Sequence, residues 1–86
     1  MNKVTKLKES INEEMYKIVN TIESCTTGEQ LLQTHNLIDN FKSSYEYLKK
    51  KKTYKPLYEN VQNFINYQKV KINLKMYNQL IENDKL

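Results

Sequence analysis

Hydrophobic residues recur along the first quarter of the chain in steps of three and four. This spacing places them on one narrow side of a helix and leaves the positions between them polar. Glu13 and Lys17 form a favourable charged pair on the polar side. The pattern predicts an amphipathic helix over residues 3–24, with an apolar stripe of Val4, Leu7, Ile11, Met15, Ile18, Ile22 and Cys25.

The segment 26–30 interrupts this pattern and contains signals for a helix start. Thr26 with Glu29, and Thr27 with Gln30, match the Thr-x-x-Glu/Gln capping box. A second helix is therefore predicted over residues 27–51, ending in lysines that complement the negative end of the helix dipole. Its apolar stripe consists of Leu31, His35, Ile38, Phe41, Tyr45 and Leu48, with Leu37 beside it.

Pro56 marks the second connection, because proline suits a first helical turn and disfavours helix in the residue before it. No Gly or Pro follows it. The sequence predicts a third helix over residues 56–83, roughly 40 Å long at 1.5 Å per residue. Residues 70–76 alternate strictly between apolar and polar, as in a half-buried strand. A lone strand would need a partner from another molecule, so helix is favoured and an intermolecular strand is the alternative.

The third predicted helix carries apolar residues on two faces. The first face runs its whole length and contains Tyr58, Val61, Ile65, Ile72, Met76 and Leu80. The second face exists only in the C-terminal half and contains Val70, Leu74, Tyr77 and Ile81. In a three-helix bundle such a broad surface can be core, but this helix outruns the other two where its second face is richest. The length therefore favours an interface with a protein partner or a second copy.

Turn-forming residues are scarce, with one Gly and one Pro among 86 residues. Hairpins and tight turns draw heavily on both residue types. The expected fold class is all-α: a small three-helix antiparallel bundle, up-down-up, with a long C-terminal helix. The bundle is expected to form a single domain over residues 1–86.

Composition narrows the class of protein further. With 38% hydrophobic and 28% charged residues, the chain is too apolar for a disordered tail and too polar for a membrane protein. Its longest apolar runs are too short for a spanning helix or a signal peptide, so we expect no membrane partner. Cys25 has no second cysteine to pair with, which favours a reducing compartment, the cytoplasm of a bacterial or host cell.

Residue usage gives a hint about the origin of the chain. All fourteen basic residues are Lys, and Asn, Ile and Tyr are abundant. This bias is typical of AT-rich coding sequences, such as those of bacteriophages, mobile elements and low-GC bacteria.

Catalytic and metal-binding chemistry has little support in the sequence. Cys25 and His35 are the one thiol and the one imidazole, and both belong to apolar stripes. There is no Cys-x-x-Cys, no His-x-x-His and no calcium-binding loop, and Gly28 alone cannot form a phosphate-binding loop. We expect a non-enzymatic protein with no cofactor, no metal and no small-molecule substrate.

A lysine cluster at residues 49–55 is the basis for an alternative function, a nucleic-acid surface. Lysines with interleaved aromatic residues are typical of single-strand binding. The same lysines are also explained by their place at a helix end, where they complement the helix dipole. The net charge of +4 is modest. Because the chain has no Arg, any nucleic-acid binding is expected to show little sequence preference. The candidate nucleic-acid residues are Lys49, Lys50, Lys51, Lys52, Tyr54, Lys55, Lys71 and Lys75.

Two functional hypotheses follow. The leading one is a protein-interaction module that binds a larger protein or assembly, or self-associates, through the C-terminal helix. A small inhibitor or accessory factor encoded by a phage or mobile element would fit this description. The alternative is a lysine-driven, sequence-nonspecific nucleic-acid-binding protein.

Overall fold

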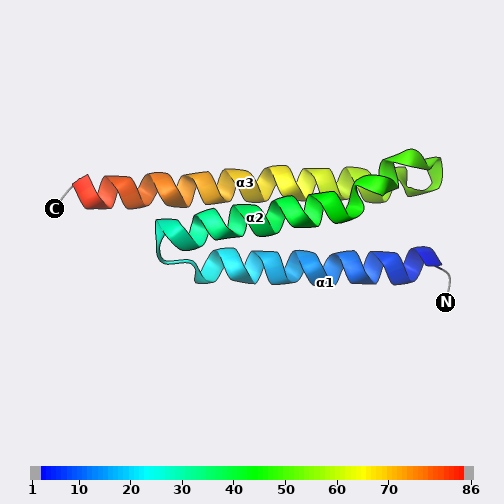
Figure 1. Ribbon diagram of the computed structural model, residues 1–86, viewed down its shortest axis with the longest axis horizontal. Coiled ribbons are helices and arrows are strands. Elements are labelled where there is room, and N and C mark those ends of the chain that lie inside the picture. The colour runs from blue at the N-terminus through cyan, green and yellow to red at the C-terminus, as the bar shows by residue number, and fades with distance from the viewer. Residues whose placement is uncertain (1–2, 85–86) are drawn as a thin grey trace.

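The chain forms three long α-helices in a computed structural model that describes residues 3–84 (Figure 1). Helix α1 spans Lys3–Ser24, α2 spans Gly28–Tyr45 and α3 spans Lys55–Asp84. Two short 3₁₀ segments, Glu46–Lys50 and Lys52–Tyr54, connect α2 to α3. The all-α three-helix prediction is confirmed, and the alternative of a strand at 70–76 is wrong, since these residues lie inside α3. Residues 1–2 and 85–86 of the expected domain lie outside the described range.

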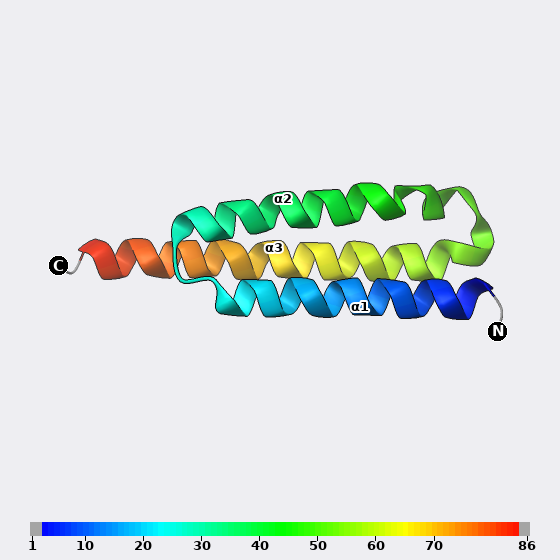
Figure 2. The same ribbon diagram turned by 60° about the horizontal axis from the view of Figure 1, so that its bottom comes forward.

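The helices lie side by side, and the chain reverses direction at each connection (Figures 1 and 2). Towards one end of the α2–α3 pair, Gln79 approaches Gly28. Further along, the Lys69 ammonium lies 3.4 Å from the Asp39 carboxylate. Residue numbers thus fall along α3 as they rise along α2, which makes the two helices antiparallel. The described part of the chain is elongated, with extents of 55 × 20 × 15 Å.

The start of α2 is set by its capping box. The Thr27 hydroxyl oxygen accepts a hydrogen bond from the Gln30 backbone N–H at 3.2 Å. In return, Gln30 Oε1 accepts from the Thr27 N–H at 3.3 Å and from the Thr26 N–H at 2.7 Å. These bonds satisfy amides that a helix start otherwise leaves free. The box predicted at Thr27 is confirmed, and the helix begins just after it.

Helix α2 ends at Tyr45, whereas the hydrophobic pattern predicted a helix to Lys51. Tyr45 leaves the α region with φ −113° and ψ 9°, and the next residues wind as a 3₁₀ helix. Such a helix has three residues per turn, so Leu48 follows Tyr45 on the same side and is fully buried. A step of three residues fits both an α-helix and a 3₁₀ helix, so the hydrophobic pattern alone could not show where the α-helix ends.

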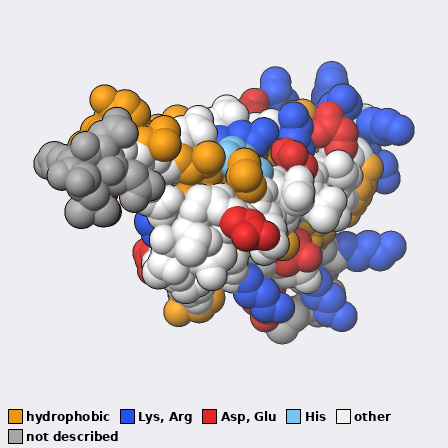
Figure 3. Space-filling view, turned by 60° about the vertical axis from the view of Figure 1, so that its left-hand side comes forward, with side chains coloured by type: hydrophobic (Ala, Val, Ile, Leu, Met, Phe, Trp, Pro, Cys, Tyr) orange, Lys and Arg blue, Asp and Glu red, His pale blue; other side chains and the backbone are white. Residues whose placement is uncertain are grey.

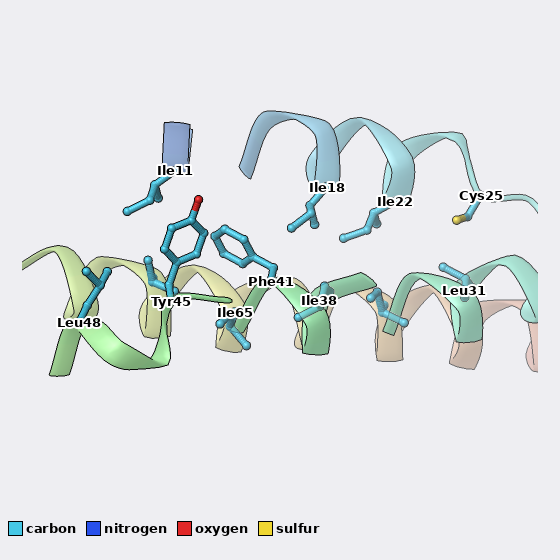
Figure 4. Close-up of a cluster of buried hydrophobic side chains, with 12 residues drawn as sticks. Ile11, Ile18, Ile22, Cys25, Leu31, Ile38, Phe41, Tyr45, Leu48 and Ile65 are labelled. Carbon is cyan, nitrogen blue, oxygen red and sulfur yellow. The ribbon is translucent and has the colours of Figure 1, made fainter. Parts of the chain in front are cut away.

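The core is one apolar layer between the three helices (Figure 4). The ring of Phe41 joins the helices, because it makes edge-to-face contacts with Tyr45 of α2 at 5.2 Å and Phe64 of α3 at 5.9 Å. Burial, together with a hydrogen bond to Glu14 of α1, raises the pKa of Tyr45 to about 12. The buried hydrophobic residues are Ile11, Ile18, Ile22, Cys25, Leu31, Ile38, Phe41, Tyr45, Leu48, Val61, Ile65 and Ile72.

Most of the predicted apolar stripes lie in this core or at its edge. Leu7 and Met15 of α1 pack against it while half-buried, and His35 of α2 is half-buried as well. Two positions differ from their predicted places: Leu37 is 41% exposed and Leu80 is 64% exposed. Leu80 was assigned to the first face of the third helix, but α3 makes its last described contact with the α1–α2 connection through Gln79. Beyond that point no described helix is available to cover it.

A polar side chain lies inside the apolar layer of α3. Gln68, between Ile65 and Ile72 on the core side, is 3% exposed. Its Oε1 atom is buried and has no hydrogen-bond partner among the described residues. An unpaired buried carbonyl costs about 1–3 kcal/mol, because the group has lost its water. Gln68 therefore lowers the stability of the bundle.

Replacing Gln68 with Met is expected to stabilise the protein. Met has a similar length and shape and removes the unpaired carbonyl, so the free energy of unfolding should rise by about 1–3 kcal/mol in urea denaturation. The matched control is Gln79→Met, because Gln79 Nε2 donates to the Thr26 carbonyl at 3.1 Å. That variant should lose about 0.5–1.5 kcal/mol. A loss of stability in Gln68→Met would show that the amide is satisfied in solution.

Candidate functional site

An exposed apolar stripe runs along the C-terminal half of α3. The four residues predicted for the second face are all exposed: Val70 at 56%, Leu74 at 55%, Tyr77 at 61% and Ile81 at 37%. The structure adds Tyr67, which is 63% exposed and extends the row by one step. The exposed stripe is therefore defined as Tyr67, Val70, Leu74, Tyr77 and Ile81. Its steps of three, four, three and four are those of a helix seam that packs against another helix.

The exposed stripe and the core occupy opposite sides of α3. At 3.6 residues per turn, Leu74 and Ile72 project about 160° apart around the helix axis. Ile72 is fully buried against the other two helices, while Leu74 is exposed. The stripe therefore faces away from both α1 and α2. It is not part of the core of this chain, which was the alternative for the second face.

The C-terminal end of α3 extends beyond the other two helices (Figure 2). Hydrophobic side chains gather towards this end of the molecule, and lysines lie mainly away from it (Figure 3). Leu80 is also exposed near this end, on the flank of α3 between the stripe and the core side. Tyr67 is the residue that the sequence reasoning left out of the stripe. The regular spacing from Tyr67 to Val70 was the signal that could have included Tyr67.

The lysine cluster occupies the other end of the bundle. Lys49, Lys50, Lys51, Lys52 and Lys55 surround a shallow concavity that Tyr58 and Glu59 complete. The lysines come from the two 3₁₀ segments, from Lys51 between them and from the first residue of α3, so the structure brings the five lysines together.

Part of the cluster is engaged within the chain. The Lys49 ammonium lies 2.8 Å from the Glu46 carboxylate, which raises the pKa of Lys49 and lowers that of Glu46. Lys51 lies over the Tyr54 ring at 5.9 Å. Tyr54 is half-buried against the core, so only part of its ring is available for stacking.

The structure does not bring Lys71 and Lys75 to this cluster. Lys71 follows Lys55 by about 24 Å along α3 at 1.5 Å per residue, and its ammonium lies 5.9 Å from the centre of the Tyr67 ring. Lys75 Nζ donates to the Ile22 carbonyl at 2.6 Å and to the Cys25 carbonyl at 3.4 Å. It thus satisfies carbonyls at the end of α1, where a helix has no partners of its own.

No hydrogen bond joins Cys25 to His35 among the described residues. Cys25 is buried, and its Sγ donates to the Thr21 carbonyl at 3.1 Å and lies 3.4 Å from the Thr34 hydroxyl. Within residues 3–84, no cluster of three His, Cys, Asp or Glu side chains is arranged to hold a metal ion. No described helix combines the length and the apolarity that crossing a membrane requires.

Comparisons with protein-family models, with curated proteins and with solved structures gave no match. Function must therefore be inferred from the geometry of this chain. The two surfaces that carry such an inference are the exposed stripe and the lysine cluster, and they belong to opposite ends of α3.

The contact of Lys75 with α1 predicts a structural role for this lysine. Lys75→Met should lower the free energy of unfolding by about 1–2 kcal/mol, because the last carbonyls of α1 lose a charged donor. Lys71→Met is the matched control, since Lys71 lies one turn earlier and contacts the Tyr67 ring instead. Urea denaturation at low protein concentration would measure both. Equal effects of the two substitutions would contradict the assignment.

Proposed function

We propose that this protein is a non-enzymatic interaction module that binds another protein surface through the exposed stripe of α3. The single observation that carries the proposal is the row of five exposed apolar side chains on the side of α3 opposite the core. Taking about 150–250 Å² for a fully exposed large side chain, these five leave on the order of 600 Å² in water. Apolar patches of this size on soluble proteins commonly mark a partner site.

The chemistry of the stripe fits a helix-packing interface. Two of its members are Tyr, which combines a large apolar ring with a polar tip and is enriched in interfaces. The stripe itself carries no charge, and its neighbours include Lys71 and the amides of Asn73 and Asn78. An apolar centre with a polar rim is the usual composition of a protein interface.

The composition, in which every basic residue is Lys and Asn is abundant, supports a more specific role. An accessory factor or inhibitor of phage or mobile-element origin acts by occupying a surface and needs no chemistry of its own. Its binding energy would come from burial of the stripe, at about 25 cal/mol per Å² before the costs of association.

Polar substitution of the stripe tests this proposal. The double variant Leu74→Gln/Ile81→Gln should unfold within about 0.5 kcal/mol of the parent at low concentration, because both side chains are already in water. The same variant should lose association, measured as molar mass by light scattering and as binding of a partner from the native host.

The comparison is a core variant with the same chemistry, Ile65→Gln/Ile72→Gln. Each of these residues is almost fully buried, and truncating such a residue costs about 2–5 kcal/mol. This variant should fail to fold. If the stripe variant also fails to fold, the stripe is part of the core in solution and the proposal is wrong.

The lysine cluster supports a second candidate function, sequence-nonspecific nucleic-acid binding. The specific observation is the convergence of five lysines around one concavity that Tyr58 also lines. Such a surface would contact phosphates, and each contact releases counterions, so affinity falls steeply with salt. Lys71 and Lys75 are not part of this candidate surface, given their distance from it and their contacts elsewhere.

Substitution of three lysines tests the second function. Affinity for a single-stranded oligonucleotide should fall with salt concentration. Lys50→Gln/Lys51→Gln/Lys52→Gln should reduce the slope of log affinity against log salt concentration by the equivalent of about two to three phosphate contacts. Fluorescence anisotropy from about 50 mM salt upwards would measure it. The matched control is Lys17→Gln/Lys69→Gln/Lys71→Gln, which removes the same charge from positions further along α1 and α3, outside the lysine cluster. If the two triple variants reduced the salt dependence equally, total charge and not the lysine cluster would explain the binding, and the cluster would not be the binding surface.

A further inference from the structure

We infer that the partner on the exposed stripe is a second copy of this chain, packed with its α3 antiparallel to the first. The inference rests on the proposed function and names its partner. It starts from the spacing of the stripe, because steps of three and four form a seam that can pack against an identical seam. A twofold axis near Leu74, the middle residue of the stripe, would place Ile81 of each copy near Tyr67 of the other.

The area of the stripe suits a dimer of this kind. The exposed side chains of the stripe amount to on the order of 600 Å² per copy, against about 800 Å² per partner in a standard stable interface. A two-helix contact over this length would therefore use nearly the whole apolar surface of α3 without help from α1 or α2. These two helices lie on the opposite side of α3 and leave the approach open.

The distribution of charge favours self-association over an oppositely charged partner. The stripe contains no Lys, Arg, Asp or Glu, and Lys71 is a charged residue beside it. Its ammonium lies over the Tyr67 ring of its own chain. The seam therefore contains no charge pattern that would select a complementary partner or repel a second copy.

The positive charge of the chain also favours the antiparallel over the parallel orientation of the two α3 helices. Each chain carries a net charge of +4, and five lysines gather at the start of α3. A parallel dimer would place the two lysine clusters next to each other. In an antiparallel dimer centred near Leu74, the two copies of Lys55 are about 57 Å apart at 1.5 Å per residue. That distance exceeds several Debye lengths at physiological salt, which are about 8 Å each.

The same arrangement covers the overhanging end of α3. Helix α3 extends past the α1–α2 connection (Figure 2), and Leu80 and Ile81 in its last turns are exposed. In the antiparallel dimer these turns would rest on the middle of the partner's α3. The length of α3, which exceeds that of either other helix, then has a physical reason.

Sedimentation equilibrium of the full chain tests the stoichiometry. The mass should approach twice the 10.4 kDa of one chain as concentration rises. Tyr77→Gln should weaken the dimer at least tenfold, because an aromatic residue next to the centre of the seam would be lost. Tyr16→Gln is the matched control: Tyr16 is 69% exposed on α1, compared with 61% for Tyr77 on α3. The control should leave the dimer unchanged.

A distance measurement tests the orientation. In a Cys25→Ser background, a spin label at Glu59→Cys reports the separation of the two α3 starts by double electron–electron resonance. The antiparallel dimer predicts about 45 Å from the helix rise, whereas a parallel dimer would bring the labels within about 20 Å. Circular dichroism would confirm that the labelled chain retains its helices.

The outcomes separate this inference from the proposed function. A chain that stays monomeric at millimolar concentration, a dimer that Tyr77→Gln does not weaken, or a short label distance would each overturn the antiparallel dimer. In these cases the proposed function still stands if the stripe variant Leu74→Gln/Ile81→Gln keeps its stability but no longer binds a partner protein other than this chain. If that variant unfolds, both the proposed function and the dimer fail.

Discussion

The apolar layer between the three helices holds this molecule together, and isoleucine dominates it. Six of its twelve buried hydrophobic residues are Ile, contributed by all three helices. A β-branched side chain in a helix has essentially one rotamer, so these residues lose little additional freedom when they pack. A chain of this size buries only about 60% of its unfolded surface. The layer must therefore be efficient, and the edge-to-face contacts of Phe41 tie it across the helices.

The position of the layer explains the remaining features of the structure. A helix face can be buried only where a neighbouring helix lies beside it. Helix α3 has 30 residues, compared with 22 in α1 and 18 in α2. Its end therefore extends past the layer, and its second apolar face has no cover within the chain. The lysines gather at the opposite end because four of them follow one another in the short connection and Lys55 begins α3 directly after it.

The sequence predicted the helices well because their signals are local. The stripe of α1 and the capping box of Thr27 and Gln30 each depend on residues within a few positions of one another. The end of α2 was misplaced because Leu48 stays buried in either winding. Leu80 was misplaced because periodicity describes one helix and cannot show where its neighbours end. The burial of Gln68 was missed for a related reason, since an amide is usually taken as a surface group. The stripe was found by its spacing, but no local pattern identifies the partner that we propose for it.

The separation of core and stripe on α3 has an evolutionary consequence. Ile72 and Leu74 are two residues apart, yet one faces the bundle and the other faces water. Most proteins lie just above a stability threshold, so substitutions that damage packing are removed by selection. Substitutions in the stripe escape this constraint, because their side chains contribute little to the stability of the isolated chain. The binding specificity that we propose for this surface could therefore diverge rapidly between related sequences while the bundle beneath it stays the same.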